Sequence, residues 1–192
     1  MSRVVVINHV TLDGVMQAPG RPDEDRSGGF EHGGWATANN DDVMGRALGE
    51  RMQGGPLLLG RRTYEDFYGF WPKQKDNPFT EALDRVQKYV ASRTLKEPLP
   101  WSNSTLLRGD AADAVAALRE QPGQDIVILG SGELIRSLMR RCLIDEYLLM
   151  IHPLILGSGR RLFPDDGAFA RLRLADSTTT TTGVLIGTYR SA

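Results

Sequence analysis

The sequence contains a single cysteine, Cys142, among its 192 residues. A chain with one thiol cannot form an internal disulfide, and such cysteine usage is typical of proteins kept in a reducing compartment. We therefore expect a cytoplasmic protein. Cys142 follows apolar residues at helical spacing, which predicts a small core residue rather than a nucleophile.

Long apolar runs are also absent. No stretch of about 18 consecutive apolar residues occurs, so the sequence predicts no membrane-spanning helix. The net charge is only −1, which argues against a global attraction to nucleic acid or to anionic membranes. The N-terminus passes directly into Val4-Val5-Val6-Ile7 without a small-residue cleavage site, and this favours a strand over a signal peptide.

Short apolar runs alternate with segments of helical spacing along the chain. Strands are expected at 4–10, 56–60, 88–92, 104–107, 126–129 and 146–151, with an antiparallel hairpin at 177–182 and 184–189. Helices are expected from the capping residues 39–42 to about 52, and at 63–70, 77–85, 111–118 and after 132. Residues 11–38 form a long loop, which is functional or disordered. This order predicts one α/β domain over residues 1–192, with a mostly parallel sheet and an antiparallel hairpin at one edge.

The most informative segment is the turn Gly130-Ser131-Gly132. It follows the buried strand at 126–129 and opens a helix whose apolar residues recur at helical spacing. A tight glycine turn from a parallel strand into a helix presents free backbone N–H groups, and these favour a phosphate together with the helix dipole. The segment therefore predicts a nucleotide-binding α/β protein.

A second turn of this kind is Gly60-Arg61-Arg62-Thr63. Gly60 permits close backbone approach, the Thr63 hydroxyl can hold a pyrophosphate oxygen, and the two arginines add positive charge. Thr63 could also cap its helix, and capping and phosphate binding can coexist. Ser92-Arg93 follows the carboxyl end of another strand, at the edge where open α/β sheets bind ligands.

Several segments stand out when they are taken in order: Thr11-Leu12-Asp13-Gly14, Gly60-Arg61-Arg62-Thr63-Tyr64, Ser92-Arg93, Leu129-Gly130-Ser131-Gly132-Glu133-Leu134, Leu143-Ile144-Asp145-Glu146-Tyr147 and His152-Pro153-Leu154-Ile155-Leu156-Gly157. In this order they resemble the dihydrofolate reductase fold. They are more closely similar to the reductase domain of the bifunctional riboflavin-pathway deaminase-reductase and its stand-alone relatives. The resemblance covers nearly the whole chain, and it implies an NADPH-dependent reductase that is commonly a homodimer.

The same resemblance implies where NADPH binds. Thr11, Asp13 and Gly14 would line the nicotinamide, and Ser92 with Arg93 would meet the adenosine 2′-phosphate. The remaining cofactor residues belong to the two turns: Gly60, Arg61, Arg62, Thr63, Leu129, Gly130, Ser131, Gly132, Glu133 and Leu134. Similar proteins usually carry two adjacent glycines in the second turn, where Ser131 replaces one of them.

Three carboxylates are candidates for supplying the proton that accompanies hydride transfer to a C=N or C=O group. Asp13 lies in the loop expected beside the nicotinamide, Asp41 starts a helix, and Asp66 follows Thr63 by one helical turn. A turn explains Asp13 and helix capping explains Asp41 equally well.

Five aromatic residues could wall a flat apolar cleft for the substrate, although core packing explains at least half of them. They are Trp35, Tyr64, Phe67, Phe70 and Trp71, of which Trp35, Phe67 and Trp71 are the substrate candidates. His9, His32 and His152 lie far apart in the sequence without metal-ligand spacing, so we expect no metal site.

The leading hypothesis is an NADPH-dependent reductase of a pterin- or pyrimidine-like heterocycle. One alternative is the 5-amino-6-(5-phosphoribosylamino)uracil reductase of riboflavin biosynthesis. Those reductases typically carry an aspartate where this chain has Phe67, and a basic residue in the first strand where this chain has only Asn8 and His9. A second alternative is a nucleotide-binding module without turnover.

Overall fold

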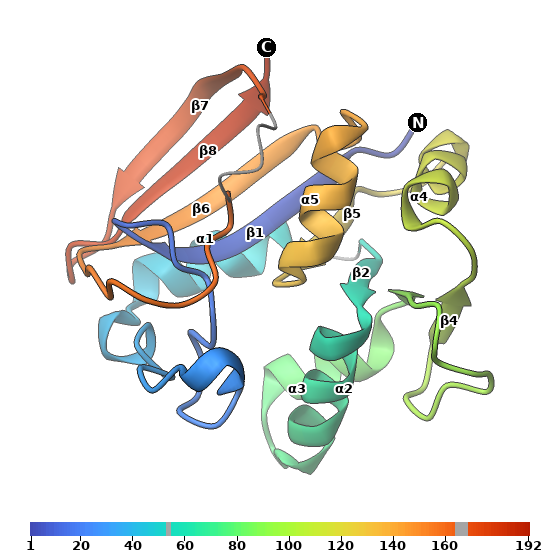
Figure 1. Ribbon diagram of the computed structural model, residues 1–192, viewed down its shortest axis with the longest axis horizontal. Helices are drawn as coiled ribbons and strands as arrows, with labels where there is room; N and C mark the ends of the chain where they lie inside the picture. The colour runs from blue at the N-terminus through green and yellow to red at the C-terminus, as the bar shows by residue number, and fades with distance from the viewer. Residues whose placement is uncertain (53–54, 164–168) are drawn as a thin grey trace. The chain divides into compact units, whose positions relative to one another are not determined.

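The computed structural model describes residues 1–52, 55–163 and 169–192. Its strands form an eight-stranded sheet in the order β4-β3-β2-β5-β1-β6-β8-β7, and the helices α1 to α5 lie between strands along the chain (Figure 1). The chain divides into two compact units, Met1–Val5 with Gly54–Ile144 and Val6–Gln53 with Asp145–Ala192. The α/β class expected from the sequence is confirmed.

The first unit holds parallel strands. They are β2 (Leu57–Gly60), β3 (Lys88–Ala91), β4 (Ser104–Leu107) and β5 (Ile126–Leu129). β2 pairs in parallel with both β3 and β5, and β3 pairs in parallel with β4. The leucines of β2 and every residue of β5 are buried, as continuous apolar runs in a parallel sheet predict. Because these strands share a direction, the turns that follow them open at one edge of the unit.

The helices of the first unit begin in two different ways. They are α2 (Arg61–Phe70), α3 (Pro78–Arg85), α4 (Ala111–Glu120) and α5 (Gly132–Arg140). The Asn77 side chain caps α3 and the Asp110 side chain caps α4, each by accepting a backbone N–H of the first turn. No side chain caps α2 or α5. The two helices that follow the glycine turns therefore keep first-turn N–H groups without a side-chain acceptor.

The second unit contains the antiparallel part of the sheet. Its elements are β1 (Val4–Thr11, whose first two residues belong to the first unit), α1 (Asp42–Arg51), β6 (Glu146–His152), β7 (Leu172–Thr179) and β8 (Leu185–Ser191). β8 pairs antiparallel with both β6 and β7, so the predicted hairpin is confirmed, although β7 starts earlier than expected. The buried Glu146 carboxylate binds Arg51 at 2.5 Å and Arg190 at 2.7 Å, which ties α1 and β8 to β6.

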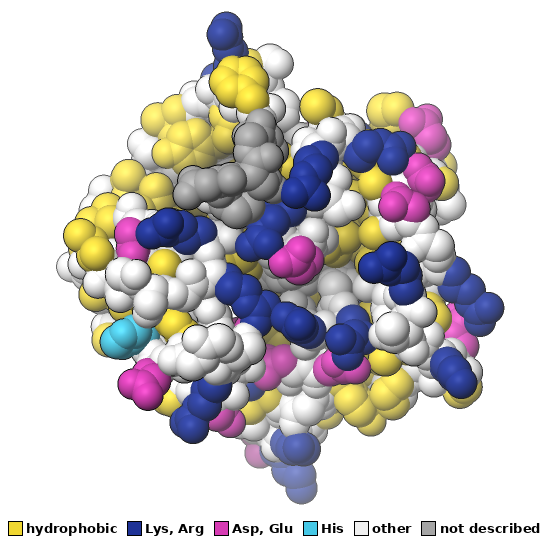
Figure 2. Space-filling model, in the orientation of Figure 1, with side chains coloured by type: hydrophobic (Ala, Val, Ile, Leu, Met, Phe, Trp, Pro, Cys, Tyr) yellow, Lys and Arg dark blue, Asp and Glu magenta, His cyan; other side chains and the backbone are white. Residues whose placement is uncertain are grey.

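The hairpin has one strand with little cover. Every residue of β7 after Leu172 is exposed, and β7 ends the strand order. Leu174 is 55% exposed and Leu185 is 40% exposed. Figure 2 shows hydrophobic side chains over the hairpin, at the upper left of the view. An uncovered edge strand with apolar residues is a surface on which a further strand or chain can pack.

The predicted loop at 11–38 is packed rather than disordered. Short 3₁₀ helices interrupt it at Ser27–Gly29 and Thr37–Asn39. A small buried cluster of Val15, Ala18 and Phe30 supports it. The buried Gln17 amide donates to the carbonyls of Asp25 and Ser27 and accepts the Arg160 N–H at 2.9 Å. The segment thus has its own core and its own polar network.

One sequence-based prediction about the core is wrong. Cys142 was expected on the buried side of a helix, but α5 ends at Arg140 and Cys142 is exposed in the turn beyond it. Its φ of 53° lies in the left-handed region, and its N–H bonds the Met139 carbonyl at 3.0 Å. The apolar residues at helical spacing continue to Cys142, whereas the helix itself ends at Arg140. Within the described ranges, no helix has the length and apolar character needed to cross a bilayer.

Candidate functional site

The two predicted phosphate turns lie against each other in the first unit. The Ser131 hydroxyl accepts the Gly60 N–H at 2.8 Å and donates to the Thr63 hydroxyl at 3.0 Å. These turns meet because β2 and β5 are neighbouring parallel strands, with Leu58 opposite Ile128. Two uncapped helix N-termini therefore open side by side, an arrangement that favours an anion such as a pyrophosphate.

Ser131 adopts a backbone conformation that glycine would adopt at lower cost. Its φ is 61° and its ψ is 48°, and Gly130 before it also has a positive φ of 59°. The left-handed conformation explains why glycines are common in such turns. In this chain the serine adds a hydroxyl that accepts the Gly60 N–H and donates to the Thr63 oxygen. The Thr63 O–H and the uncapped first-turn N–H groups are then the donors left for a ligand.

Substitutions of Ser131 should separate the hydroxyl from the backbone strain. Ser131→Ala leaves the Gly60 N–H without its acceptor and keeps a side chain in the left-handed conformation. We expect it to lower the free energy of unfolding by about 1–3 kcal/mol. Ser131→Gly loses the same bond but relieves the strain, and it should recover about 1 kcal/mol of that loss. Urea unfolding of both variants checks the order, and equal stabilities would contradict the assignment of strain.

The charged residues of the two turns lie at the surface. Arg61 and Arg62 are exposed and belong to α2, which starts earlier than the predicted residue 63. Arg61 binds Glu65 at 3.3 Å. Glu133 binds Arg136 at 2.7 Å in the first turn of α5, so its carboxylate already has a cationic partner. Leu129 and Leu134, which flank the second turn in the sequence, are buried.

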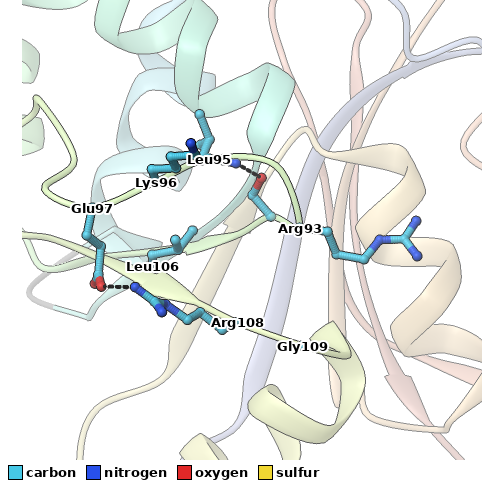
Figure 3. Close-up of a pocket in the computed structure, with 8 residues that line it drawn as sticks. Arg93, Leu95, Lys96, Glu97, Leu106, Arg108 and Gly109 are labelled. Carbon is cyan, nitrogen blue, oxygen red and sulfur yellow. Dashed lines mark hydrogen bonds and ion pairs between the residues drawn. The ribbon is translucent and has the colours of Figure 1, made fainter.

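A cavity of about 600 Å³ opens at the carboxyl ends of β3 and β4, around the predicted residues Ser92 and Arg93 (Figure 3). Its other lining residues are Leu95, Lys96, Glu97, Leu106, Arg108 and Gly109. The Ser92 hydroxyl accepts the N–H groups of Thr94 and Leu95 at 3.1 and 3.0 Å, which orders the turn after β3. Leucine and cationic side chains thus line the same pocket, a combination of apolar and polar groups that is common in small-ligand sites.

The cations of this cavity differ in how they are paired. Arg108 binds Glu97 at 2.9 Å, and in Figure 3 the Arg93 side chain extends away from that pair. Among the residues that the structure describes, Arg93 and Lys96 form no ion pair. Lys96 and Arg108 were not predicted as site residues. Both follow carboxyl ends of parallel strands, the signal that could have identified them.

Asp13 holds two turns of the second unit together. Its carboxylate accepts the Thr11 hydroxyl at 2.5 Å and the N–H groups of Leu156 and Gly157 at 3.3 and 2.9 Å. The Thr11 hydroxyl, and then the backbone N–H groups, lower the pKa of Asp13 below its usual value. Asp13 is thus an ionised hydrogen-bond acceptor at neutral pH. These contacts argue against the predicted role of Asp13 as a proton donor, which stays a prediction.

The other two carboxylates lie on different helices. Asp41 caps α1 by accepting the Met44 N–H at 2.9 Å, and its second oxygen accepts the Thr181 N–H and hydroxyl, each at 2.7 Å. The Met44 N–H and the Thr181 hydroxyl lower the pKa of Asp41. Asp66 is half-buried on α2, one turn beyond Thr63. Asp41 therefore has a structural task, whereas Asp66 lies on the helix that starts at the first phosphate turn.

The predicted aromatic wall is divided between the units. Phe67 and Trp71 pack edge to face in the first unit with ring centroids 6.5 Å apart, and Trp71 also packs on Phe79 at 4.6 Å. Trp35 belongs to the second unit, where its indole N–H donates to the Gln17 carbonyl at 2.7 Å. All three predicted residues remain half-buried, so part of each ring is accessible.

The structure brings together two histidines that the sequence separates. His9 Nδ1 lies 2.9 Å from His152 Nε2, and the Asn39 amide nitrogen lies 3.3 Å from His152 Nδ1. Trp35 packs edge-on against His152 at 5.2 Å. Burial, and then the neighbouring His152, lower the pKa of His9 to about 3, and burial lowers the pKa of His152 to about 4. Both rings are neutral at physiological pH. In the described part of the chain, no cluster of three metal-ligating side chains occurs.

The sequence is similar to two uncharacterized proteins of Bacillus subtilis strain 168. YyaP is 30% identical over 133 residues, 67% of this chain and 70% of YyaP. YwjB is 34% identical over 123 residues, and the match spans 62% of this chain and 63% of YwjB, less than two thirds of that relative.

Two solved structures share the fold. One is a protein from Shewanella sp. PV-4 described as a riboflavin biosynthesis protein, with a TM-score of 0.73, 24% identity and coverage of 100% of this chain and 99% of the other. Another is a pyrimidine reductase-like protein from Corynebacterium diphtheriae, with a TM-score of 0.64, 16% identity and coverage of 100% and 92%. The sequence model of the RibD C-terminal domain matches residues 3–186. The chain therefore belongs to the RibD C-terminal domain family.

Proposed function

We propose that this protein is an NADPH-dependent reductase that transfers hydride to a small pterin- or pyrimidine-like heterocycle. The observation that carries the proposal is the basic cavity at the carboxyl ends of β3 and β4, where Arg93 and Lys96 form no ion pair within the described residues. Membership in the RibD C-terminal domain family and the likeness to a pyrimidine reductase-like protein support the reductase class.

The residues of the first unit fit the phosphates of NADPH. The adenosine 2′-phosphate would lie against Ser92 and Arg93, with Lys96 as a second cation and Leu95 and Leu106 flanking the adenine. The pyrophosphate would take the uncapped N-termini of α2 and α5. We assign the nicotinamide to the turn at Thr11-Leu12-Asp13-Gly14, in which Asp13 holds the backbone rigid.

Bound NADPH supplies the hydride, and the protein has to supply or admit a proton. Asp13 and Asp41 accept several hydrogen bonds that keep them ionised, so they are poor proton donors. We therefore propose Asp66, or a water molecule that it orients, as the proton source. Trp35, Phe67 and Trp71 are the proposed substrate-contacting aromatics.

Oxidation of NADPH across a substrate panel tests this function. The panel contains pterins, aminopyrimidines and quinones, and quenching of tryptophan fluorescence by NADPH and by NADH measures cofactor binding separately. We expect micromolar NADPH binding, at least tenfold weaker NADH binding, and turnover with one heterocycle class. NADPH binding without oxidation of any compound would favour a nucleotide-binding module, and no binding of either cofactor would overturn the proposal.

A second candidate substrate is 5-amino-6-(5-phosphoribosylamino)uracil. Family membership favours it, and the likeness to a protein described as acting in riboflavin biosynthesis adds to this. Phe67 and Ile7-Asn8-His9 do not offer the charged groups that a ribose phosphate would use. Including this compound in the panel decides between the two substrates.

We also propose that the protein is a homodimer that buries the hairpin. The exposed edge strand β7, with Leu174 at 55% exposure, is the surface for a second copy. Light scattering after size exclusion should give twice the chain mass, and Leu174→Lys should shift it toward the monomer. A monomeric wild-type protein at micromolar concentration would contradict this assignment.

A further inference from the structure

The histidine pair of the second unit is one link in a chain of hydrogen bonds. His9 is near the carboxyl end of β1, His152 ends β6, and Asn39 ends the 3₁₀ helix before α1. The links are Asn39 to His152 at 3.3 Å and His152 to His9 at 2.9 Å. Thr182 holds Asn39, the first residue of this hydrogen-bonded series, because its hydroxyl donates to the Asn39 carbonyl at 2.7 Å.

The Asn39 amide determines which atom donates and which accepts in the hydrogen bonds from Asn39 to His152 and from His152 to His9. An amide NH₂ group only donates, so His152 Nδ1 is an acceptor and its proton is on Nε2. His152 Nε2–H then donates to His9 Nδ1, so the proton of a neutral His9 ring is on Nε2. Both rings stay neutral at pH 7, because burial holds both pKa values far below their usual range. His9 therefore presents an uncharged N–H group.

That N–H group has no acceptor within the described part of the protein. His9 is half-buried, and its Nδ1 edge faces His152. Its Nε2 is not one of the fully buried polar atoms without a hydrogen-bond partner. The protonated Nε2 is thus not fully buried. Trp35 packs against His152, so the donor lies in the same cluster as a proposed substrate-contacting aromatic ring. The carboxylates nearest in sequence, Asp13 to His9 and Asp41 to Asn39, both accept hydrogen bonds from other groups.

We propose that His9 Nε2–H is a specificity-determining donor for an uncharged acceptor, namely a carbonyl oxygen or a ring nitrogen of the substrate heterocycle. This inference rests on the proposed reductase function, and it narrows the substrate class. A neutral donor favours a lactam-type carbonyl or an imine-type nitrogen, and gives no ion pair to a phosphate or carboxylate. Asn39 and His152 are positioning residues, because they act only through the His9 ring.

Two substitutions of His9 separate its two ring nitrogens. His9→Asn keeps an acceptor near the Nδ1 position toward His152 and removes the outward donor. His9→Gln places an amide NH₂ near the Nε2 position and weakens the link to His152. We expect KM for the heterocycle to rise about 3- to 10-fold more in H9N than in H9Q, which corresponds to one neutral hydrogen bond.

The cofactor measurement keeps this test separate from the proposed function. NADPH binding should be equal in H9N and H9Q, because neither substitution touches the residues proposed to bind the 2′-phosphate and the pyrophosphate, and both change the same side chain on β1. Equal KM values in H9N and H9Q would overturn the inference while leaving the reductase intact. Absence of turnover in the wild type would instead overturn the proposed function, and the tautomer measurement below still tests His9.

The tautomer of His9 can be measured without any substrate. Nitrogen-15 NMR of the labelled protein at pH 7 should show His9 and His152 as neutral rings protonated at Nε2. Asn39→Ala removes the donor that fixes the Nε2-protonated tautomers, so both tautomers of each ring should become populated. Asn40→Ala changes the adjacent exposed asparagine, and as the control it should keep the wild-type spectrum. A wild-type His9 protonated at Nδ1, or charged at pH 7, would overturn the inference.

Discussion

Replacing Arg93 by alanine is expected to weaken NADPH binding by about 10- to 150-fold while NADH binding barely changes. Arg93 is exposed at the rim of the basic cavity and makes no ion pair within the described residues, so its guanidinium can bind a dianionic monoester. A charged hydrogen bond contributes roughly 1.5–3 kcal/mol, and this range converts to the expected factor. NADH lacks the 2′-phosphate and therefore loses nothing. Quenching of tryptophan fluorescence measures both affinities.

Arg141→Ala is the matched control for this substitution. Arg141 is also exposed and basic in the first unit, but it binds Asp113 at 3.0 Å and does not line the cavity. Its removal should leave both cofactor affinities unchanged, which excludes a general effect of lost positive charge. An equal loss of NADPH and NADH binding in R93A would show that the guanidinium does not meet the 2′-phosphate.

The strands and turns of the first unit could be predicted because their burial leaves a direct pattern. β2 and β5 are covered on both faces, so they read as continuous apolar runs followed by glycine turns. The contact between Ser131 and Gly60 depends on β2 and β5 being neighbours, and that strand order is a property of the whole sheet. Each turn was therefore predictable, while the hydroxyl that joins them was not.

Other site residues were missed for different reasons. Lys96 and Arg108 follow carboxyl ends of strands, but surface cations are common and only the shape of the cavity distinguishes them. His9 and His152 are 143 positions apart, and the packing of the second unit sets their contact. The direction of their hydrogen bonds depends on the Asn39 amide, for which no periodic pattern exists. Cys142 was misplaced because apolar spacing does not mark where a helix closes.

The neutral histidine pair should make the second unit sensitive to mild acid. In the unfolded chain both rings titrate near the usual value of about 6.5, whereas in the folded protein the pKa values lie near 3 for His9 and 4 for His152. Below pH 6.5 the unfolded state binds more protons, so stability falls as the pH falls. The loss approaches about 1.4 kcal/mol per pH unit for each histidine, or roughly 2 kcal/mol each between pH 7 and pH 5.

Urea unfolding at several pH values between 7 and 5 measures this loss. Asp13 and Asp41 do not contribute to the change in stability between pH 7 and pH 5. Their pKa values are lowered in the folded protein, so the stabilisation they provide is lost only at more acidic pH, below about 4 to 5. His9→Asn should lower the slope of stability against pH by about half, because one of the two neutral rings is gone. His32→Asn removes an exposed imidazole and is the control for the substitution itself. A wild-type stability that is flat from pH 7 to pH 5 would mean that the pair already holds a proton in the folded protein, and the neutral donor assigned to His9 would then be wrong.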